Sequence, residues 1–151
     1  MRFVLDVHLG KLARHLRMLG FDALWEEAYS DEEIARIGKD ERRLILTRDR
    51  RLLEERKIRR GYLVNAVEPK AQMKEVIRRF KLLKKIKPFT VCLECNGRIA
   101  QIAKEKVLDR LDAETKKYYD EFFTCRKCGK IYWRGSHYNR MEKLIEGLPK
   151  K

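Results

Sequence analysis

Short apolar runs and helically spaced apolar residues alternate over the first part of the chain. Residues 3–5, 44–47 and 62–64 are compact apolar runs of the kind found in buried strands, and residues 23–26 form a weaker one. The segments between them carry apolar residues three or four positions apart, which is helical spacing. This order predicts an α/β fold with a mostly parallel sheet and helices on its faces.

Residues with terminal preferences mark where the predicted helices begin and end. Gly20 follows the apolar face of the first helix and suits a helix end. Ser30 and Glu33 match a capping box at the start of the next helix. Pro69 suits the first turn of a last helix over residues 70–87. We therefore assign residues 1–87 to an N-terminal α/β domain.

The predicted helix over residues 70–87 is strongly basic. It holds eight Lys or Arg residues against one Glu, while its apolar residues keep helical spacing. Its outer face carries Lys74, Arg78, Lys81 and Lys85. Three interpretations stay open for this face: a solvated surface, a helix on a membrane surface, or a rail for the phosphates of a nucleic acid.

The chain as a whole is basic too, with a formal charge of +14 and an isoelectric point near 9.8. This charge favours a polyanionic partner. No apolar run approaches the roughly 18 residues of a membrane span. The N-terminal residues read as a strand rather than as a secretion signal. We expect a cytoplasmic protein that has no membrane partner.

The four cysteines form two pairs, Cys92 with Cys95 and Cys125 with Cys128. Each pair has the C-x-x-C spacing that lets two thiolates bind one metal ion from a tight turn, and four thiolates satisfy a tetrahedral structural zinc site. Two disulfides are the alternative, which a reducing cytosol disfavours. An iron site of the rubredoxin type is another. A closed four-sulfur site has no open position for a substrate, so the reaction must take place elsewhere.

The cysteines belong to a second predicted unit, residues 88–151, which starts where Pro88 breaks the strand–helix pattern. Here the pattern predicts a helix over residues 112–119, a strand over residues 131–133 and a C-terminal helix over residues 138–148. We therefore expect a zinc ribbon followed by a helix.

Three aspartates lie where the chain leaves predicted strands. Asp6 and Asp49 follow apolar strands, and Asp31 follows the weaker strand at a helix start. Because sites in parallel sheets form beyond the carboxyl ends of the strands, these side chains can converge on one edge. Clustered carboxylates bind hard cations such as Mg²⁺ or Mn²⁺, which activate water and stabilise a leaving oxygen.

Each of these acids also has a purely structural explanation. Asp6 and Asp49 can cap the helices that follow them, and Asp31 suits the positive end of a helix dipole. Glu68 offers a fourth carboxylate after the last strand, but a helix N-terminus explains it equally well.

Four segments together resemble the Mut-seven C-terminal RNase family. They are Asp6 with residues 9–22, residues 45–49, residues 92–96 and residues 125–137. Because that family is PIN-like, the resemblance implies a metal-dependent ribonuclease that acts on RNA, with Asp6, Asp31 and Asp49 as metal-binding catalytic acids. The fourth acid of PIN nucleases has no sure counterpart here. The sequence does not determine the oligomeric state, but PIN-like domains often pair, so the resemblance leaves a homodimer open.

Further basic and aromatic residues are candidates for RNA contacts. Arg14 and Arg17 follow Asp6 on the first predicted helix, where they can clamp a phosphate or form a solvated face. Trp133 and His137 lie beside the second cysteine pair, where bases can stack, although Trp133 also suits the core of a small ribbon. The competing class of function is a non-catalytic RNA-binding or assembly factor whose acids are only helix caps.

Overall fold

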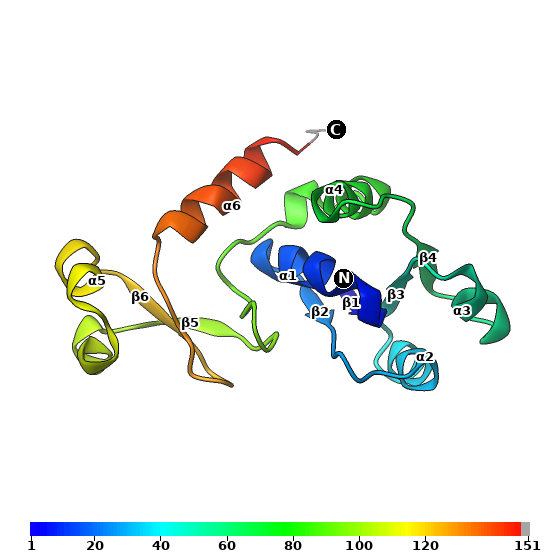
Figure 1. Cartoon of the computed structure of the whole chain (residues 1–151), viewed down its shortest axis with the longest axis horizontal. Helices are drawn as coiled ribbons and strands as arrows, with labels where there is room; N and C mark the ends of the chain where they lie inside the picture. Colours follow the sequence, from blue (N-terminus) through cyan, green and yellow to red (C-terminus); the bar gives the residue numbers. More distant parts are fainter. Residues whose placement is uncertain (149–151) are drawn as a thin grey trace.

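The computed structural model describes residues 1–148 of the 151-residue chain (Figure 1). Its N-terminal part contains a four-stranded sheet of β1 (Arg2–Leu5), β2 (Asp22–Leu24), β3 (Leu44–Thr47) and β4 (Gly61–Leu63). All three strand pairings are parallel, and the spatial order is β2-β1-β3-β4. The α/β fold with a parallel sheet is therefore confirmed.

Helices cover both faces of this sheet. The connecting elements are η1 (Val7–Leu9), α1 (Gly10–Met18), α2 (Asp31–Asp40), α3 (Arg50–Glu55) and α4 (Pro69–Arg79). Phe3 and Leu5 pack in the core beneath α1 and α4, whereas Val4 packs in the smaller core beneath α2 and α3. Successive strand side chains point to opposite faces, so one short apolar strand supplies both cores.

The strand order places a topological switch point between β1 and β3. From β1 the chain passes through α1 to β2 on one side, and α2 then returns it to β3 on the other side of β1. The connections after β1 and β3 therefore lead to helices on opposite faces of the sheet, α1 on one face and α3 on the other. Ligands of open α/β sheets bind at such points.

The basic helix is shorter than the sequence pattern predicts. α4 ends at Arg79, and Lys81 adopts a left-handed conformation with φ of 53°. The amide of Leu82 donates to the carbonyl of Ile77 at 3.0 Å, which closes the helix end as a Schellman motif. Lys81 thus lies in the turn, and Lys85 lies in the separate turn η2 (Leu83–Lys85).

A glycine allows the linker after η2 to cross the end of α1. Gly20 has φ of +94°, and a Cβ atom there would lie 2.1 Å from the carbonyl oxygen of Lys87. The amide of Lys87 donates to the carbonyl of Leu19 at 2.9 Å. A left-handed glycine therefore both ends α1, as predicted, and lets the linker pack against it.

The C-terminal part contains an antiparallel sheet of β5 (Ile99–Ile102), β6 (Phe122–Cys125) and β7 (Ile131–Tyr132). Between β5 and β6 lie η3 (Lys104–Lys106), η4 (Leu108–Arg110) and α5 (Ala113–Tyr118). Val107, Leu111 and Phe122 form a small core of their own, against which Trp133 packs. The predicted helix over residues 112–119 and the strand after the second cysteine pair are present, whereas β5 was not predicted.

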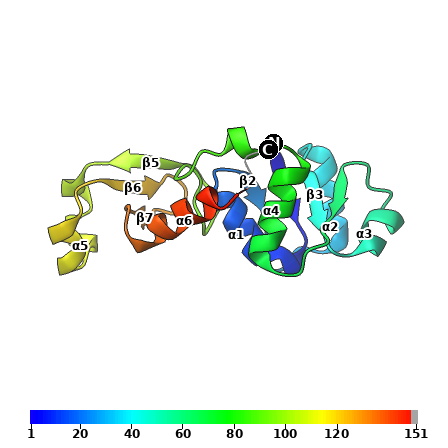
Figure 2. The same ribbon diagram turned by 90° about the horizontal axis from the view of Figure 1, so that it is seen from above.

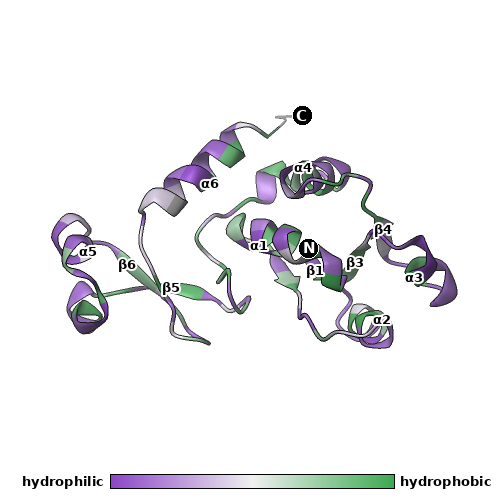
Figure 3. Cartoon of the chain, viewed as in Figure 1, coloured by the Kyte–Doolittle hydropathy of each residue, from purple (hydrophilic) through white to green (hydrophobic). Residues whose placement is uncertain are grey.

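The last helix, α6 (Ser136–Glu146), connects the ribbon back to the first domain. Leu144, Ile145 and Leu148 pack against the core beneath α1 and α4. Figure 2 shows α6 near the middle of the elongated molecule, running from the ribbon toward α1 and α4. Figure 3 shows that the strands are largely apolar, while the helices combine apolar and polar residues. Among residues 1–148, no helix has the length and apolar character to cross a membrane.

Candidate active site and metal centre

Thr47 connects two of the predicted acids at the carboxyl edge of the sheet. Its hydroxyl donates to Oδ2 of Asp6 at 2.7 Å and accepts from the amide of Asp49 at 2.9 Å. Thr47 is fully buried, and Asp6 is 5% exposed. Asp6 leaves β1 and Asp49 leaves β3, so the two acids flank the switch point between these strands. The last residue of a strand thus holds both loops in a fixed relation.

Both acids also act as helix caps. Oδ1 of Asp49 accepts from the amide of Arg51 at 2.9 Å and caps α3. Oδ1 of Asp6 is 3.5 Å from the amide of His8, a long contact at the start of η1. The structural explanation is therefore well supported for Asp49, whereas Asp6 is held chiefly by Thr47.

Asp31 is exposed in the first turn of α2. Ser30 caps this helix, because its hydroxyl accepts a hydrogen bond from the amide of Glu33 at 3.1 Å. Among residues 1–148, the four cysteines are the one group of three or more His, Cys, Asp or Glu side chains whose ligand atoms all lie within 4.8 Å of one another. Within these residues, Asp6, Asp31 and Asp49 form no such group.

Sequence reasoning missed one acid, Glu75, near the end of β4. Its carboxylate accepts from the hydroxyl of Tyr62 at 2.6 Å and from the amides of Asn65 and Ala66 at 2.9 and 2.8 Å. Burial raises the pKa of Glu75, but these three hydrogen bonds outweigh it and hold the pKa below its usual value. Glu75 braces the loop after β4. A sequence pattern that places it on a basic helix carries no sign of this role.

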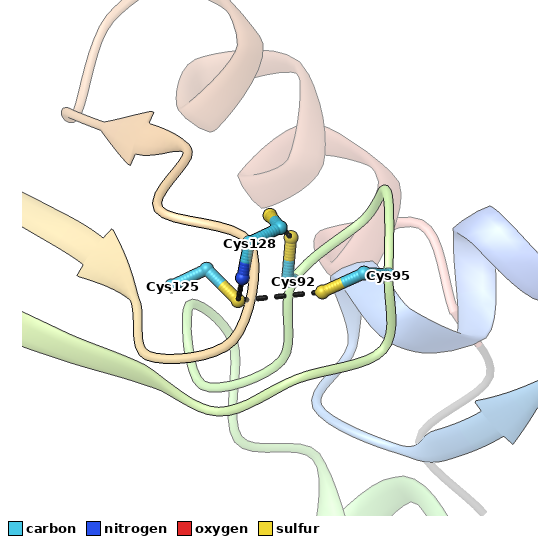
Figure 4. Close-up of side chains that lie close together, drawn as sticks. All are labelled: Cys92, Cys95, Cys125 and Cys128. Carbon is cyan, nitrogen blue, oxygen red and sulfur yellow. Dashed lines mark hydrogen bonds between the residues drawn. The ribbon is translucent and has the colours of Figure 1, made fainter.

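The four cysteine side chains converge between the two domains, as Figure 4 shows. Sγ of Cys92 lies 3.7 Å from Sγ of Cys128, and Sγ of Cys95 lies 3.4 Å from Sγ of Cys125. A tetrahedral zinc ion with bonds of about 2.3 Å separates its sulfurs by about 3.8 Å. Disulfide bonding requires about 2.05 Å, so these thiols are free and fit a metal. The cluster can bind a structural metal such as zinc.

Hydrogen bonds to sulfur surround this cluster. The hydroxyl of Tyr132 lies 2.9 Å from Sγ of Cys92 and accepts from the amide of Leu93. Burial raises the pKa of the Cys125 thiol. Hydrogen bonds from the amides of Cys128 and Lys127 outweigh this effect and lower the pKa to about 6. Such amides favour the thiolate that a metal requires.

Gly97 allows the two cysteine turns to approach each other. A Cβ atom at this position would lie 2.8 Å from Sγ of Cys125 and 3.2 Å from Sγ of Cys95. Real Cβ atoms essentially never approach this closely, so any larger residue would displace the first turn from the second. The glycine after the first C-x-x-C pair thus serves the metal centre directly.

Arg17 attaches the first cysteine turn to the N-terminal domain. Its side chain is 4% exposed and donates to the carbonyls of Ala23 and Leu93, each at 2.9 Å, and to the carbonyl of Glu94 at 3.3 Å. These contacts correct the expectation that Arg17 clamps a phosphate: its donors are used inside the protein. Arg14 remains half-exposed and forms an ion pair with Glu94 at 2.9 Å.

A second contact between the domains passes through Asn96, directly after the first cysteine pair. Its side-chain oxygen accepts from the amide of Ala23 at 2.9 Å, and its side-chain nitrogen donates to Asp22 at 2.6 Å. Asp22 in turn binds the buried Arg43 at 2.7 Å, and Arg43 donates to the carbonyl of Phe3 at 3.1 Å. The edge strand β2 is thereby fastened to the metal centre on one side and to β1 on the other.

The remaining predicted RNA contacts lie on several elements. Lys74 and Arg78 are exposed on α4, and Lys81 and Lys85 are exposed beyond its end. Trp133 is half-buried, with its ring centroid 6.2 Å from that of Phe122 in the ribbon core. The side chain of His137 lies outside the described residues.

One of three comparisons with known proteins found a match, and it covers most of the chain. Curated proteins and solved structures gave no significant match. The family model described as the Mut7-C RNAse domain matches residues 1–145. This match includes the sheet edge, the four cysteines and nearly all of α6. The chain therefore belongs to the Mut7-C RNAse domain family, in which a ribonuclease acting on RNA is the expected activity.

Proposed function

We propose that this protein is a divalent-metal-dependent ribonuclease whose active site is the carboxyl edge of the parallel sheet. The observation that carries the proposal is the position of Asp6 and Asp49 on the two sides of the β1–β3 switch point, joined through the hydroxyl of Thr47. Asp31 supplies a third carboxylate from the next loop. The three acids would hold Mg²⁺ or Mn²⁺, both of which prefer oxygen ligands.

The separation of the acids is compatible with such a cation. Mg²⁺ keeps several of its own waters and takes only one or two carboxylates directly, so more distant acids can bind it through water. When bound, the cation lowers the pKa of a water molecule and stabilises the charge of the leaving oxygen. Thr47 orients the Asp6 carboxylate, and its bond to the Asp49 amide keeps the second loop in place.

The cysteine cluster has a different part in the proposal. Four thiolates close the coordination sphere of zinc, so this metal would stabilise the ribbon and take no part in cleavage. The ribbon and the basic surface of Lys74, Arg78, Lys81 and Lys85 would position the RNA strand. Arg14 and Trp133 would contact it between the two domains, and His137 stays a prediction from the sequence. The division at residue 87, the cytoplasmic location and the homodimer also stay predictions.

One observation favours the competing function, a non-catalytic RNA-binding or assembly factor. Asp49 caps α3 through a well-formed bond of 2.9 Å to Arg51, and Asp6 caps η1. Helix caps need no metal, so the two functions differ in whether the folded protein binds Mn²⁺ at these acids.

A Mn²⁺ titration of the zinc-loaded protein separates the two functions. For a nuclease, Asp6→Asn weakens Mn²⁺ binding, and wild-type protein cleaves mixed cellular RNA only when Mn²⁺ or Mg²⁺ is present. Asp40→Asn is the matched control, because Asp40 is an exposed residue at the far end of α2. Equal Mn²⁺ binding by the wild-type and Asp6→Asn proteins, with no cleavage, supports the binding factor.

A further inference from the structure

An aromatic cavity of about 460 Å³ lies between the ribbon, α1 and the start of α6. Its walls include Phe89, Tyr132, Trp133 and Tyr138. The ring of Phe89 meets those of Tyr138 and Tyr132 edge-on, with centroids 5.3 and 6.1 Å apart. These rings all come from the C-terminal part of the chain, and Arg14 and Met18 of α1 complete the lining, so the cavity lies where α1 meets that part.

Positive side chains surround this apolar cavity. Arg14 and Lys130 line it, and both bind the single carboxylate of Glu94, at 2.9 and 3.1 Å. One acid between two cations leaves a net positive charge at the rim. The guanidinium of Arg134 lies 5.5 Å from the ring centroid of Tyr138, but it forms an ion pair with Glu121 at 3.0 Å and adds no net charge.

A second cavity of about 560 Å³ continues along α1 toward the sheet edge that carries the aspartates. It shares Arg14 and Met18 with the aromatic cavity, and its three cations, Arg14, Lys11 and Lys70, outnumber its one carboxylate, Glu68. His15 also lines it, and its Nδ1 is buried with no hydrogen-bond partner in the part of the chain that the structure describes. Because α1 begins at the carboxyl edge and ends near the ribbon, its exposed side joins the two places.

We propose that the aromatic cavity binds one base of a single-stranded RNA whose backbone then follows α1 to the acidic sheet edge. This inference rests on the proposed function, since it names where that enzyme holds its substrate away from the cut. Aromatic faces stack on any base, while Arg14 and Lys130 pair with the phosphates on either side. An apolar peptide segment would fill the cavity but would leave this positive rim unused.

The test measures binding without cleavage. The protein carries Asp6→Asn, retains its zinc and receives no Mg²⁺ or Mn²⁺. The ligands are a hexamer of uridine and six versions of it, each lacking the base at one position. Binding should weaken by roughly tenfold when one particular base is missing, because stacking of a single base contributes about that much. It should change little at the other positions.

Two variants then locate that base. Tyr138→Ala removes a wall of the cavity, and Ser136→Trp places a large side chain into it. Each should lower the affinity for the intact hexamer by roughly tenfold and abolish the penalty for the missing base. Tyr138→Phe keeps the ring and should retain the affinity. Tyr118→Ala is the control, because Tyr118 is an exposed aromatic residue on α5.

The fluorescence of Trp133 gives a readout that needs no cavity variant. Trp25→Phe leaves Trp133 as the single tryptophan, since the chain contains two. Quenching of this signal by the hexamer supports the proposal. Uniform binding of all six base-deficient hexamers overturns it, as does a Trp133 that responds to anilinonaphthalene sulfonate but not to RNA. If the protein binds one base in the cavity but cleaves no RNA, the ribonuclease proposal fails and the cavity proposal stands. If the protein cleaves RNA but binds all six base-deficient hexamers equally, the cavity proposal fails and the ribonuclease proposal stands.

Discussion

The guanidinium of Arg17 in α1 donates to the carbonyl of Leu93 in the first cysteine turn at 2.9 Å. The two residues are 76 positions apart in the chain, so this bond joins α1 to the cysteine cluster. Asn96 adds a parallel contact to the edge strand β2. The ribbon is therefore docked on the sheet rather than tethered by the linker alone.

This docking gives Arg17→Met a clear expected effect. The change leaves the carbonyls of Ala23, Leu93 and Glu94 without a donor, and unpaired buried carbonyls cost about 1–3 kcal/mol each before partial relaxation. We expect a loss of roughly 2–4 kcal/mol in the free energy of unfolding, measured with urea. Arg36→Met, at an exposed position of α2, should change it by less than about 0.5 kcal/mol. Equal effects of the two substitutions would show that the contact adds no stability.

Removal of zinc should unfold the ribbon and leave most of the parallel sheet intact. Small ribbons derive much of their folding free energy from the metal, whereas the sheet has two apolar cores of its own. Because Asn96 follows the first cysteine pair, unfolding of the ribbon also removes the hydrogen bond between the Ala23 amide in β2 and the Asn96 side chain. Hydrogen exchange after chelation should therefore rise throughout β5–β7 and at Ala23, but not in β3.

Elemental analysis should find about one zinc per chain in the purified protein. A protein without zinc, or with two disulfides in freshly isolated samples, would contradict the structural zinc site. Zinc-free protein with full protection in β5–β7 would show instead that the ribbon core of Val107, Leu111 and Phe122 suffices.

The sequence pattern predicted those features that depend on local periodicity or on rare residue types. Strands such as β3 are short apolar runs, and the four cysteines had no other partners, so the sheet and the cysteine cluster followed from the chain alone. The end of α4 did not, because Phe80 and Leu83 continue the helical spacing past the turn at Lys81. The spacing of apolar residues does not show the left-handed backbone conformation of Lys81.

Contacts between distant segments were also beyond the sequence. An arginine on a basic chain suits a phosphate site, yet Arg17 is buried, where it meets the carbonyl of Ala23 in β2 and two carbonyls of the distant first cysteine turn. Thr47 ends a predicted strand, and only the parallel register of β1 and β3 brings it to Asp6. The residues at the sheet edge were predictable, whereas their spacing and partners were not.

Glu75 should make the stability of the protein depend on acid pH. Its folded-state pKa lies below the usual value near 4.5, so its contribution is fully present above that pH and is lost as the pH falls through the lowered pKa. Glu75→Gln should destabilise the protein by roughly 1–3 kcal/mol at pH 7. The difference from wild type should shrink between about pH 5 and pH 3. A difference that stays constant with pH would mean that the charge of Glu75 contributes nothing.

Four lysines or arginines near α4 should set the salt dependence of RNA binding. Replacing Lys74, Arg78, Lys81 and Lys85 with Gln should weaken binding to all sequences alike, because phosphate contacts carry no base information. The slope of log affinity against log salt should flatten by roughly 0.7 per lost phosphate contact. Replacement of Arg36, Lys39, Arg42 and Lys57, exposed residues beside the opposite face of the sheet, removes the same charge as a control. Equal flattening in both variants would indicate that only net charge matters.

The three aspartates should separate catalysis from binding. Asp6→Asn and Asp49→Asn should each lower metal-dependent cleavage by at least roughly 10²-fold, since a bound cation supplies several kcal/mol of transition-state stabilisation. RNA binding should be unchanged or tighter, because a negative charge near phosphate is lost. Asp49→Asn keeps a side-chain oxygen that can still cap α3, so a loss of cleavage there cannot be assigned to an unfolded helix.

Asp31→Asn is the most informative of the three substitutions. Asp31 is exposed, and Ser30 already caps α2, so a purely structural role predicts a cost of no more than about 1 kcal/mol and full activity. As a metal-binding residue, Asp31→Asn should instead lose cleavage like Asp6→Asn while its urea unfolding stays close to wild type. Single-turnover cleavage rates and unfolding curves on the same samples distinguish these cases. If Asp6→Asn and Asp49→Asn cleave as fast as wild type, the activity belongs to a contaminant and the sheet edge is only a set of helix caps.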